Sequence, residues 1–382
     1  MAFKPQEVAE ISVNGRKYRD WESVTVKLAE GESNPSFRFT VSEGKPLSKN
    51  FADIRIRPGD HCTIKLAGEL AITGYVETRQ VAYTGEQHGI EISGVGYTKA
   101  MADGAASTDT GNEFRKKSFK EIADTATKQH GLTFKALTPL PNRPFERASI
   151  PPGESWWNFL ETLARQRRIT LGTDKEGNLT GRCYFEGGGA QLVEGKNILE
   201  GREVMTINQG GGPNDAVGQH GANNLNFGPK VTHGAKSSSK ANVSTGGKGV
   251  HAPNRQLAEH PGMKEDTDLR SNHESDQRGA EQLQVTIVVQ GWLKSGGGGL
   301  WKPGEKVHVK SPMLIVDETL DLVSATFTQD NKSGTRTTLE LKRPGDEDSD
   351  GGKNKLDFDP AKTTPKSPET GAPGARSPSL GE

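Results

Sequence analysis

Membrane spans, secretion signals and cysteine frameworks are all missing from this sequence of 382 residues. No apolar run approaches the ~20 residues that a membrane-spanning helix needs. The N-terminal residues MAFKPQEVAE have no apolar stretch of the kind that marks a secretion signal. Cys62 and Cys183 are too few and too far apart for a disulfide framework or a zinc site. We therefore expect no membrane insertion, reduced thiols and synthesis in the cytoplasm.

An excess of charge of either sign is also missing. Lys and Arg together number 49, as do Asp and Glu, so the formal net charge is zero. Proteins that bind nucleic acids usually carry a basic face and a high pI. The composition therefore predicts no sequence-specific nucleic-acid partner.

Patterns of catalytic or metal-binding residues are absent as well. The nine histidines are scattered, and neither an HExxH nor a GxSxG motif occurs. The segment STGGKG around Lys248 lacks the spacing of a phosphate-binding loop. We expect no catalytic residues, no metal site and no cofactor, and hence a protein that is not an enzyme.

What the sequence does contain is a series of short alternating apolar stretches in its first hundred residues. Period-two alternation places one face of a strand in a core and the other in water. Several such strands separated by turns predict a barrel or a sandwich, and we assign residues 1–102 to a first β-barrel. The alternating apolar positions include Ile11, Val13, Val24, Val26, Phe37, Phe39, Cys62, Ile64, Ile90 and Ile92.

A different periodicity marks residues 103–190. Two segments, FKEIADTATKQHGLTF (119–134) and WWNFLETLARQRRITL (156–171), align without a gap, and each reads as an amphipathic helix that leads into a short strand. Ser118 with Glu121 forms a predicted capping box at the start of the first helix. We therefore expect an inserted α/β region that is made of two helix–strand modules.

The remainder, residues 191–345, again predicts strands around a long polar segment. Residues 208–275 are rich in Gly, Ser and Asn and cannot bury enough apolar area to offset their ordering entropy, so we expect a long loop there. Five of the histidines fall in or beside this loop, where we expect solvated side chains. After residue 345 the chain is rich in Pro, Ser, Thr and Gly, which predicts a disordered tail over 346–382.

A repeat connects the two β regions. RPGDHCTIK (57–65) and KPGEKVHVK (302–310) match position for position, with a Pro-Gly turn that leads into an alternating strand. Reuse of a common turn is one explanation. Two copies of one barrel, separated by the insert, is the sharper one and predicts a β-rich α+β fold with two antiparallel barrels.

Four segments carry a family resemblance. VNGRKYRDWESVTVKL, WWNFLETLARQRRITLGTDKEGNLTGR, GKNILEG and VTIVVQGWLKSGGGGLWKPGEKVHV resemble, in this order, the baseplate hub protein of Mu-like contractile-tailed phages, over roughly residues 8–345. The resemblance implies tail-tube-like barrels and a homotrimer in the virion baseplate. It also implies a central spike protein and the tail tube or other baseplate proteins as partners. A peptidoglycan- or glycan-binding tail module is the alternative, and a hydrolase in the insert is a third reading.

Five residues are candidates for contacts between subunits. Trp292 and Trp301 flank the hairpin LKSGGGGL, where either local packing or a neighbouring subunit could engage them. Trp157 is adjacent to Trp156 on a predicted helix, so one of the two is expected in the core and the other against a second domain or chain. Arg165 and Arg168 belong to a basic helix end that is either solvated or paired across an interface.

Overall fold

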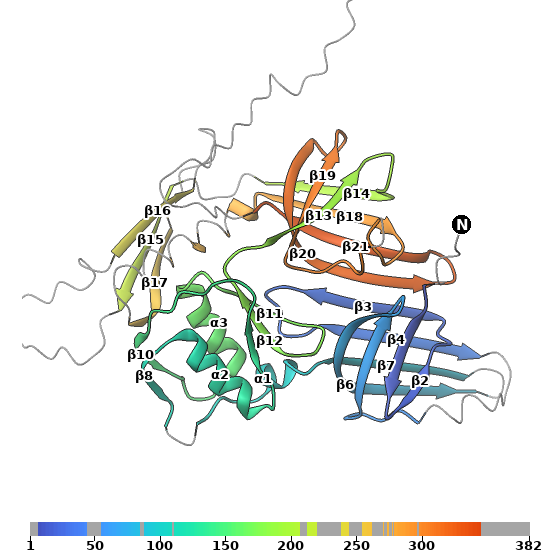
Figure 1. Ribbon diagram of the computed structural model, residues 1–382, viewed down its shortest axis with the longest axis horizontal. Coiled ribbons are helices and arrows are strands. Elements are labelled where there is room, and N and C mark those ends of the chain that lie inside the picture. Colours follow the sequence, from blue (N-terminus) through green and yellow to red (C-terminus); the bar gives the residue numbers. More distant parts are fainter. Residues whose placement is uncertain are drawn as a thin grey trace, which may run out of the picture.

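The structure is a computed structural model that is built mainly of β-strands. It describes residues 7–43, 55–84, 88–108, 111–206, 212–219, 238–243, 254–261, 270, 273–274, 277, 279–295 and 298–344. Figure 1 shows two β units, one in blue and one mainly in orange, with a green α/β insert beside them. The predicted β-rich fold with few helices is confirmed.

The first β unit is formed by the N-terminal strands, which follow the predicted alternation. Its strands are β1 (Ala9–Val13), β2 (Arg16–Tyr18), β3 (Ser23–Ala29), β4 (Ser36–Glu43), β5 (His61–Leu66), β6 (Glu69–Tyr83) and β7 (His88–Gly96). They lie in the order β3-β4-β7-β6-β5-β1-β2, and all neighbours are antiparallel.

The second β unit comes from the C-terminal third of the chain together with two strands that follow the insert. Its strands are β13 (Glu186–Val193), β14 (Glu200–Met205), β18 (Leu283–Gln290), β19 (Glu305–Ser311), β20 (Val316–Asp330) and β21 (Gly334–Lys342). Their order is β14-β18-β21-β20-β19-β13, which repeats the order β3-β4-β7-β6-β5-β1 of the first unit, where β2 is an additional strand. One difference is that β13 pairs with β19 in parallel, whereas β1 pairs with β5 antiparallel.

The repeat is visible in the backbone of both units. Gly59 and Gly304 adopt φ values of 88° and 91°, a backbone conformation that residues other than glycine rarely adopt. The Gly59 N–H donates to Val76 O, and the Gly304 N–H donates to Leu322 O, each at 2.8 Å. Immediately after these acceptors, one residue of β6 and one of β20 drop out of register with the neighbouring strand. Such bulges bend a strand at a fixed place, so the two units share a detail that general β propensity does not explain.

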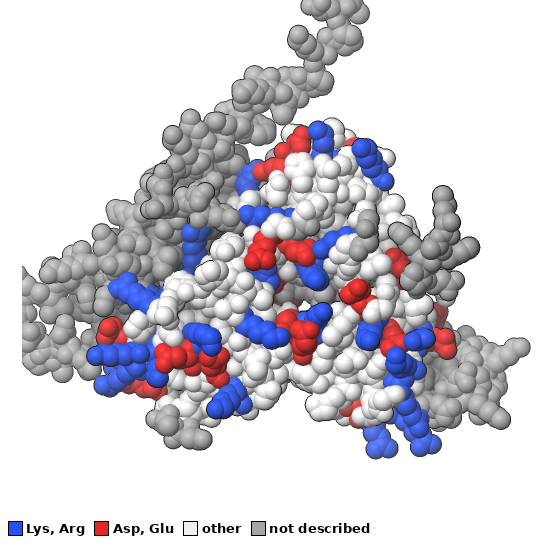
Figure 2. All heavy atoms as spheres, viewed as in Figure 1, with Lys and Arg blue, Asp and Glu red and all other residues white. Residues whose placement is uncertain are grey.

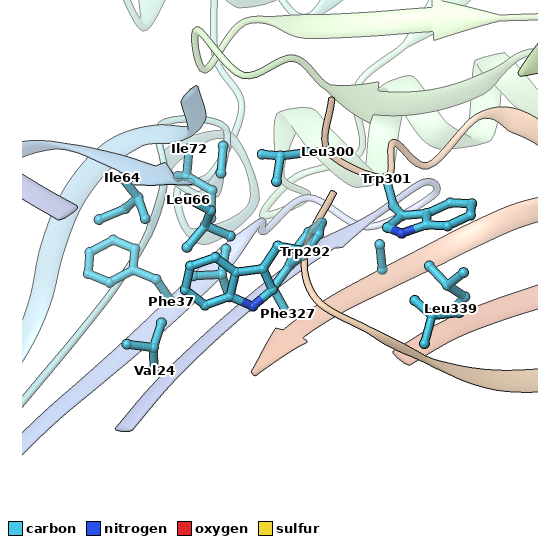
Figure 3. Packing of buried hydrophobic residues seen from close by; sticks show 14 of the residues in the cluster. Val24, Phe37, Ile64, Leu66, Ile72, Trp292, Leu300, Trp301, Phe327 and Leu339 are labelled. Atoms are coloured by element: carbon cyan, nitrogen blue, oxygen red, sulfur yellow. The ribbon is translucent and has the colours of Figure 1, made fainter. Parts of the chain in front are cut away.

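The two units form one continuous sheet. β20 pairs with β3 antiparallel, and this pairing joins the units into a sheet of 13 strands. Their apolar side chains accordingly form one core, in which Trp292 and Phe327 lie between Val24 and Phe37 of the first unit and Trp301 and Leu339 of the second (Figure 3). The sequence predicted two copies of one barrel separated by the insert; the structure has two like β units, joined by a strand pair, and closure of each unit into a barrel stays a prediction.

The insert lies between the two β units in the sequence and has a hydrophobic core of its own. Its elements are α1 (Lys99–Asp103), β8 (Glu113–Lys117), α2 (Phe119–Gln129), β9 (Phe134–Ala136), β10 (Phe145–Ser149), α3 (Trp156–Gln166), β11 (Thr170–Thr173) and β12 (Leu179–Arg182). β8 pairs with β10, while β9 and β11 both pair with β12. The insert therefore contains two strand–helix–strand units that meet through equivalent strands.

The two helices of the insert start and end alike. Ser118 and Ser155 are N-caps whose hydroxyls accept from the third backbone N–H of each helix, and the capping box with Glu121 is present. At the other end, Gly131 and Arg168 both take positive φ values, 68° and 58°. The two helix–strand segments of the insert therefore begin and end in the same way.

Part of the segment expected to be a loop is a small sheet. β15 (Gly212–Gln219), β16 (Ser238–Val243) and β17 (Asn254–Pro261) form three strands, with β15 in the middle. This sheet lies on the side of the insert that carries β10 (Figure 1). The strands are defined by backbone pairing, which the Gly-, Ser- and Asn-rich composition did not predict. Apart from residues 270 and 273–274, the rest of the predicted loop lies outside the described residues, as does the predicted tail over 346–382.

Candidate functional site

The seam between the two β units is the pairing of β3 with β20. Val26 lies opposite Phe327 and Leu28 lies opposite Ala325, and Val26 and Phe327 are fully buried. Only the half of β20 beyond its bulge takes part, because the earlier half pairs with β19 on the same side. The Glu30 N–H donates to Val323 O at 2.9 Å and extends the backbone bonding to the bulge itself. This seam shows how one copy of the β unit docks on another.

Two strand edges that correspond to this seam stay open. β14 holds the place in the second unit that β3 holds in the first, and no described strand pairs with its outer edge. The half of β6 beyond its bulge, Thr78–Tyr83, corresponds to the seam half of β20, and β7 is the one described strand that pairs with it. Exposed apolar side chains lie on both segments, among them Val81, Tyr83 and Met205. Unpaired strand edges of this kind are ready templates for adding another strand.

The three candidate tryptophans are buried inside the chain. Trp292 and Trp301 belong to the core of the β units, and the Trp292 indole N–H donates to Thr328 O at 3.2 Å. Trp157 is 5% exposed and lies in the core of the insert, as does its neighbour Trp156. Their packing roles are therefore visible, while a contact of these tryptophans with another subunit stays a prediction.

The two candidate arginines lie at the C-terminal end of α3. Arg165 is 4.0 Å from Glu161 one turn earlier, and Arg168 is the residue with positive φ that follows the helix. Both lie near His273, whose pKa is lowered to about 3 by its burial and by the charges of Arg270, Arg168 and Arg165. His273 was expected to be a solvated loop residue, which is wrong. The role of Arg165 and Arg168 at a subunit interface stays a prediction.

An ion pair connects all three parts of the molecule. Glu30 follows β3, Arg182 ends β12 of the insert, and their side chains form an ion pair at 2.9 Å with both groups largely buried. Arg182 also donates through Nη1 to Gly304 O at 2.8 Å, in the Pro-Gly turn of the second unit. Burial raises the pKa of Glu30 to about 7, although the charge of Arg182 opposes this rise.

A cavity of about 240 Å³ adjoins this ion pair. Residues of both β units and of the insert line it, among them Leu28, Glu30, Leu70, Thr173, Arg182 and Trp301. Three buried polar atoms of these residues, Glu30 Oε2, Arg182 Nε and Trp301 Nε1, have no hydrogen-bond partner among the described residues. The cavity is lined by apolar and polar groups and has room for several water molecules, which would supply such partners.

The surface and the remaining side chains give no sign of a catalytic or metal centre. Lys, Arg, Asp and Glu are intermixed on the face shown in Figure 2, in agreement with the zero net charge. Within the described residues, no cluster of His, Cys, Asp and Glu has the arrangement of a metal site. The same residues include no helix with the length and apolar character needed to cross a bilayer.

Sequence reasoning missed the seam, the open edges and the Glu30–Arg182 pair. The segment EGESNP around Glu30 carries no recognisable pattern, and 152 positions separate Glu30 from Arg182. The repeat of the Pro-Gly turn is a sequence signal that leads toward the seam. It identifies β5 and β19 as equivalent strands, and therefore also β6 and β20, which follow them.

Comparisons with known families agree with the domain order. Residues 8–96 match the N-terminal domain of the Mu phage baseplate assembly protein GpP-like family. Residues 98–180 match the second domain of the baseplate hub protein gp44-like family, and residues 278–346 match a tail protein C-terminal domain. These matches correspond to the first β unit, the insert and most of the second β unit.

Individual relatives cover nearly the whole described chain. The baseplate hub protein gp44 of Escherichia phage Mu is 22% identical over 336 residues, which are 87% of this chain and 86% of that protein. The 43 kDa tail protein of prophage MuSo2 from Shewanella oneidensis has a TM-score of 0.76 at 23% identity, covering 88% of this chain and 98% of that one. An E. coli type VI secretion component, described as similar to the T4 tail proteins gp27 and gp5, shares the fold at a TM-score of 0.58 and 9% identity, covering 88% of this chain and 77% of that one. Over residues 8–346 the chain is therefore similar to the baseplate hub and tail proteins of Mu-like phages, and it matches domain models of these proteins in three consecutive parts.

Proposed function

We propose that this protein is a structural, non-enzymatic hub that assembles as a homotrimer and joins the sixfold tail tube to the threefold central spike. The observation that carries the proposal is the presence of two like β units in one chain, joined edge to edge through β3 and β20. Closed rings are the common outcome when a chain repeats one contact around an axis. Three copies of this chain would present six similar β units, and such a ring matches a sixfold partner on one side and a threefold partner on the other.

Shape and symmetry, rather than chemistry, would perform this function. Each β unit would complete a barrel-like position of the ring, one face of the ring would accept tail tube or other baseplate proteins, and the opposite face would hold the spike. A zero net charge suits a hub whose channel must let DNA pass without binding it tightly. Assembly would take place in the host bacterial cytoplasm, and the finished ring would lie in the baseplate of the virion.

The native mass in solution tests the proposal. Light scattering on a sizing column is expected to give about 124 kDa, three times the chain mass of 41.2 kDa. The interfaces of a permanent ring should each bury well above ~2,000 Å². A mass near that of one chain across the micromolar range would contradict the trimer. Co-sedimentation with purified peptidoglycan would instead support the alternative, a glycan-binding tail module.

A further inference from the structure

We infer that β14 of one copy of this chain adds as an antiparallel strand to the β6 edge Thr78–Tyr83 of a second copy, and that the ring is closed by this repeated seam. The inference rests on the proposed ring of copies and specifies the contact within it. Its basis is the in-chain seam, which supplies a worked example of the same two elements docked on each other.

The equivalence of the elements follows from the repeat. β14 borders β18 as β3 borders β4, and β6 borders β5 and β7 as β20 borders β19 and β21. The bulges provide the register, because the residue that drops out is Glu77 in β6 and Val323 in β20. Residues of the seam half of β20 therefore correspond to residues 246 positions earlier in β6, so that Phe327 corresponds to Val81.

The same reasoning fixes the partner residues on β14. Val26 lies opposite Phe37 in the first unit, and Glu203 lies opposite the corresponding position, Val285, in the second. Glu203 of one copy should therefore lie opposite Val81 of the next, as Val26 lies opposite Phe327 within the chain. Met205 then lies opposite Arg79, and Gly201 lies opposite Tyr83.

The exposed apolar side chains fall on the face that this register requires. Val81 is 47% exposed, Tyr83 77% and Met205 47% in the single chain. All three alternate onto the face that is core at the in-chain seam, since Val81 corresponds to Phe327 and Met205 corresponds to Leu28. Tyr83 lies opposite Gly201, beside which the Leu314 side chain packs, so its ring would meet an apolar neighbour. Adding the strand would cover apolar groups that one chain by itself leaves in water.

Charge complementarity selects a second copy of this chain as the occupant. Glu203 has a buried oxygen, Oε1, with no hydrogen-bond partner among the described residues, and burial raises its pKa. In the inferred register, Arg79 of the neighbouring copy lies diagonally across from Glu203 on the same face, within reach of a long side chain. An incoming copy would therefore provide the cation that Glu203 lacks, and Arg79 is exposed and available.

Paired cysteines test the register directly. Val81→Cys with Glu203→Cys, in a Cys183→Ser background that keeps the buried Cys62, places two thiols on directly opposed residues, at a spacing that a disulfide can span. Mild oxidation is expected to give covalent dimers and trimers on a non-reducing gel. The matched control, Val81→Cys with Arg202→Cys, points one thiol to the other face and should cross-link far less.

A charge swap tests the inferred ion pair by an independent readout. Arg79→Glu should raise the concentration for half-dissociation of the trimer at least about tenfold, because it leaves two carboxylates together at the contact. Adding Glu203→Arg should restore most of the loss, whereas Lys116→Glu on the exposed face of the insert should change little. A trimer by mass whose in-register cysteines do not cross-link, or whose Arg79→Glu variant behaves like the control, would overturn the seam and leave the hub standing. A chain that stays monomeric at every concentration would overturn both.

Discussion

The two β units have the same strand order and differ most at one strand, β3 in the first unit and β14 in the second. The inward positions of β3 are Val24 and Val26, both buried against the second unit. The corresponding positions of β14 are Gly201 and Glu203, which are too small or too polar to form a core alone. The comparison teaches that the same strand position has two uses. In the first unit β3 pairs with β20 of the same chain, whereas in the second unit the outer edge of β14 has no described partner strand.

A second difference between the units lies at the hairpin that follows each Pro-Gly strand. β5 and β6 are joined by the small residues Ala67 and Gly68, both with positive φ. β19 and β20 are joined by Pro312–Ile315 instead, and Met313 there is 81% exposed. Glu194 holds this turn by accepting from Ser311 Oγ at 2.6 Å and from Met313 N at 3.0 Å. A ring of three chains would carry this apolar turn three times. The turn would therefore follow the threefold symmetry of the ring and not its approximate sixfold symmetry.

The largest expected effect comes from a charge in the common core. Ile64 and Val309 hold equivalent positions after the repeated turn, and both are fully buried. Ile64→Asp or Val309→Asp should each lower the free energy of unfolding by at least ~4 kcal/mol, because a carboxylate is buried without a partner. Since the core is continuous, either change should destabilise both units together. Urea unfolding monitored by circular dichroism should then show a single transition. Lys310→Asp on the exposed face is the control, and two separate transitions would show that the units are independent.

A smaller effect on the free energy of unfolding should distinguish the β3–β20 seam from the open edge of β6. Phe327→Ala removes a buried ring from the in-chain seam and should cost about 3–5 kcal/mol of unfolding free energy. Val81→Ala at the corresponding position of β6 should cost less than ~0.5 kcal/mol in the dissociated chain, because its side chain is exposed. Urea titrations of both variants at one low protein concentration would compare them. Equal losses would argue that Val81 is already packed within a single chain.

The two glycines of the repeated turns should respond unequally. Gly59→Ala and Gly304→Ala both force a side chain into positive φ, at a cost of about 1–2 kcal/mol. A Cβ at Gly59 meets nothing, whereas a Cβ at Gly304 collides with the guanidinium of Arg182. Because Arg182 is buried and paired with Glu30, it cannot move freely, so Gly304→Ala should cost about 1–2 kcal/mol more. Thermal unfolding of both variants would measure the difference, and equal midpoints would show that Arg182 yields.

Local patterns predicted the elements of this fold well. The alternation around Ile64 and Val309, the capping box of Ser118 with Glu121 and the twin helix–strand modules are all set by neighbours in sequence, and the structure has them. The repeated Pro-Gly turn also carried correct information about architecture, since it marks equivalent strands in both units.

The sequence did not predict the long-range pairing of strands, and most of the candidate site depends on that pairing. β3 and β20 are nearly 300 residues apart, and nothing in either strand states its partner. Without that pairing, the sequence left local packing in the hairpin and contact with a neighbouring subunit open for Trp292 and Trp301; in the structure both lie in the shared core. Glu30 was not predicted at all, because its role depends on Arg182 and on a turn of the second unit.

The smallest expected effect concerns the ion pair at the inner end of the seam. The pKa of Glu30 is about 7 in the folded chain and near 4.5 when unfolded, so folding binds a proton between these values. The stability that Glu30 contributes by this route is fully present below about pH 4.5 and is lost as the pH rises through about 7. The charged side chains of Asp174, Lys175, Glu176 and Lys302 also line the cavity.

Glu30→Gln should therefore flatten the pH dependence of unfolding between pH 5.5 and 8. The expected change is about 1–2 kcal/mol across that range, because each unit of pKa shift corresponds to ~1.4 kcal/mol. Glu32→Gln is the matched control, since Glu32 is an exposed carboxylate on the same turn that pairs with Lys27 at 2.9 Å. Urea unfolding at four pH values would compare the slopes of the two variants with that of the parent. If Glu30→Gln kept the parental slope, the carboxylate would be ionised in the folded chain at all these pH values. The joint between the two β units and the insert would then be a permanent salt bridge, insensitive to pH.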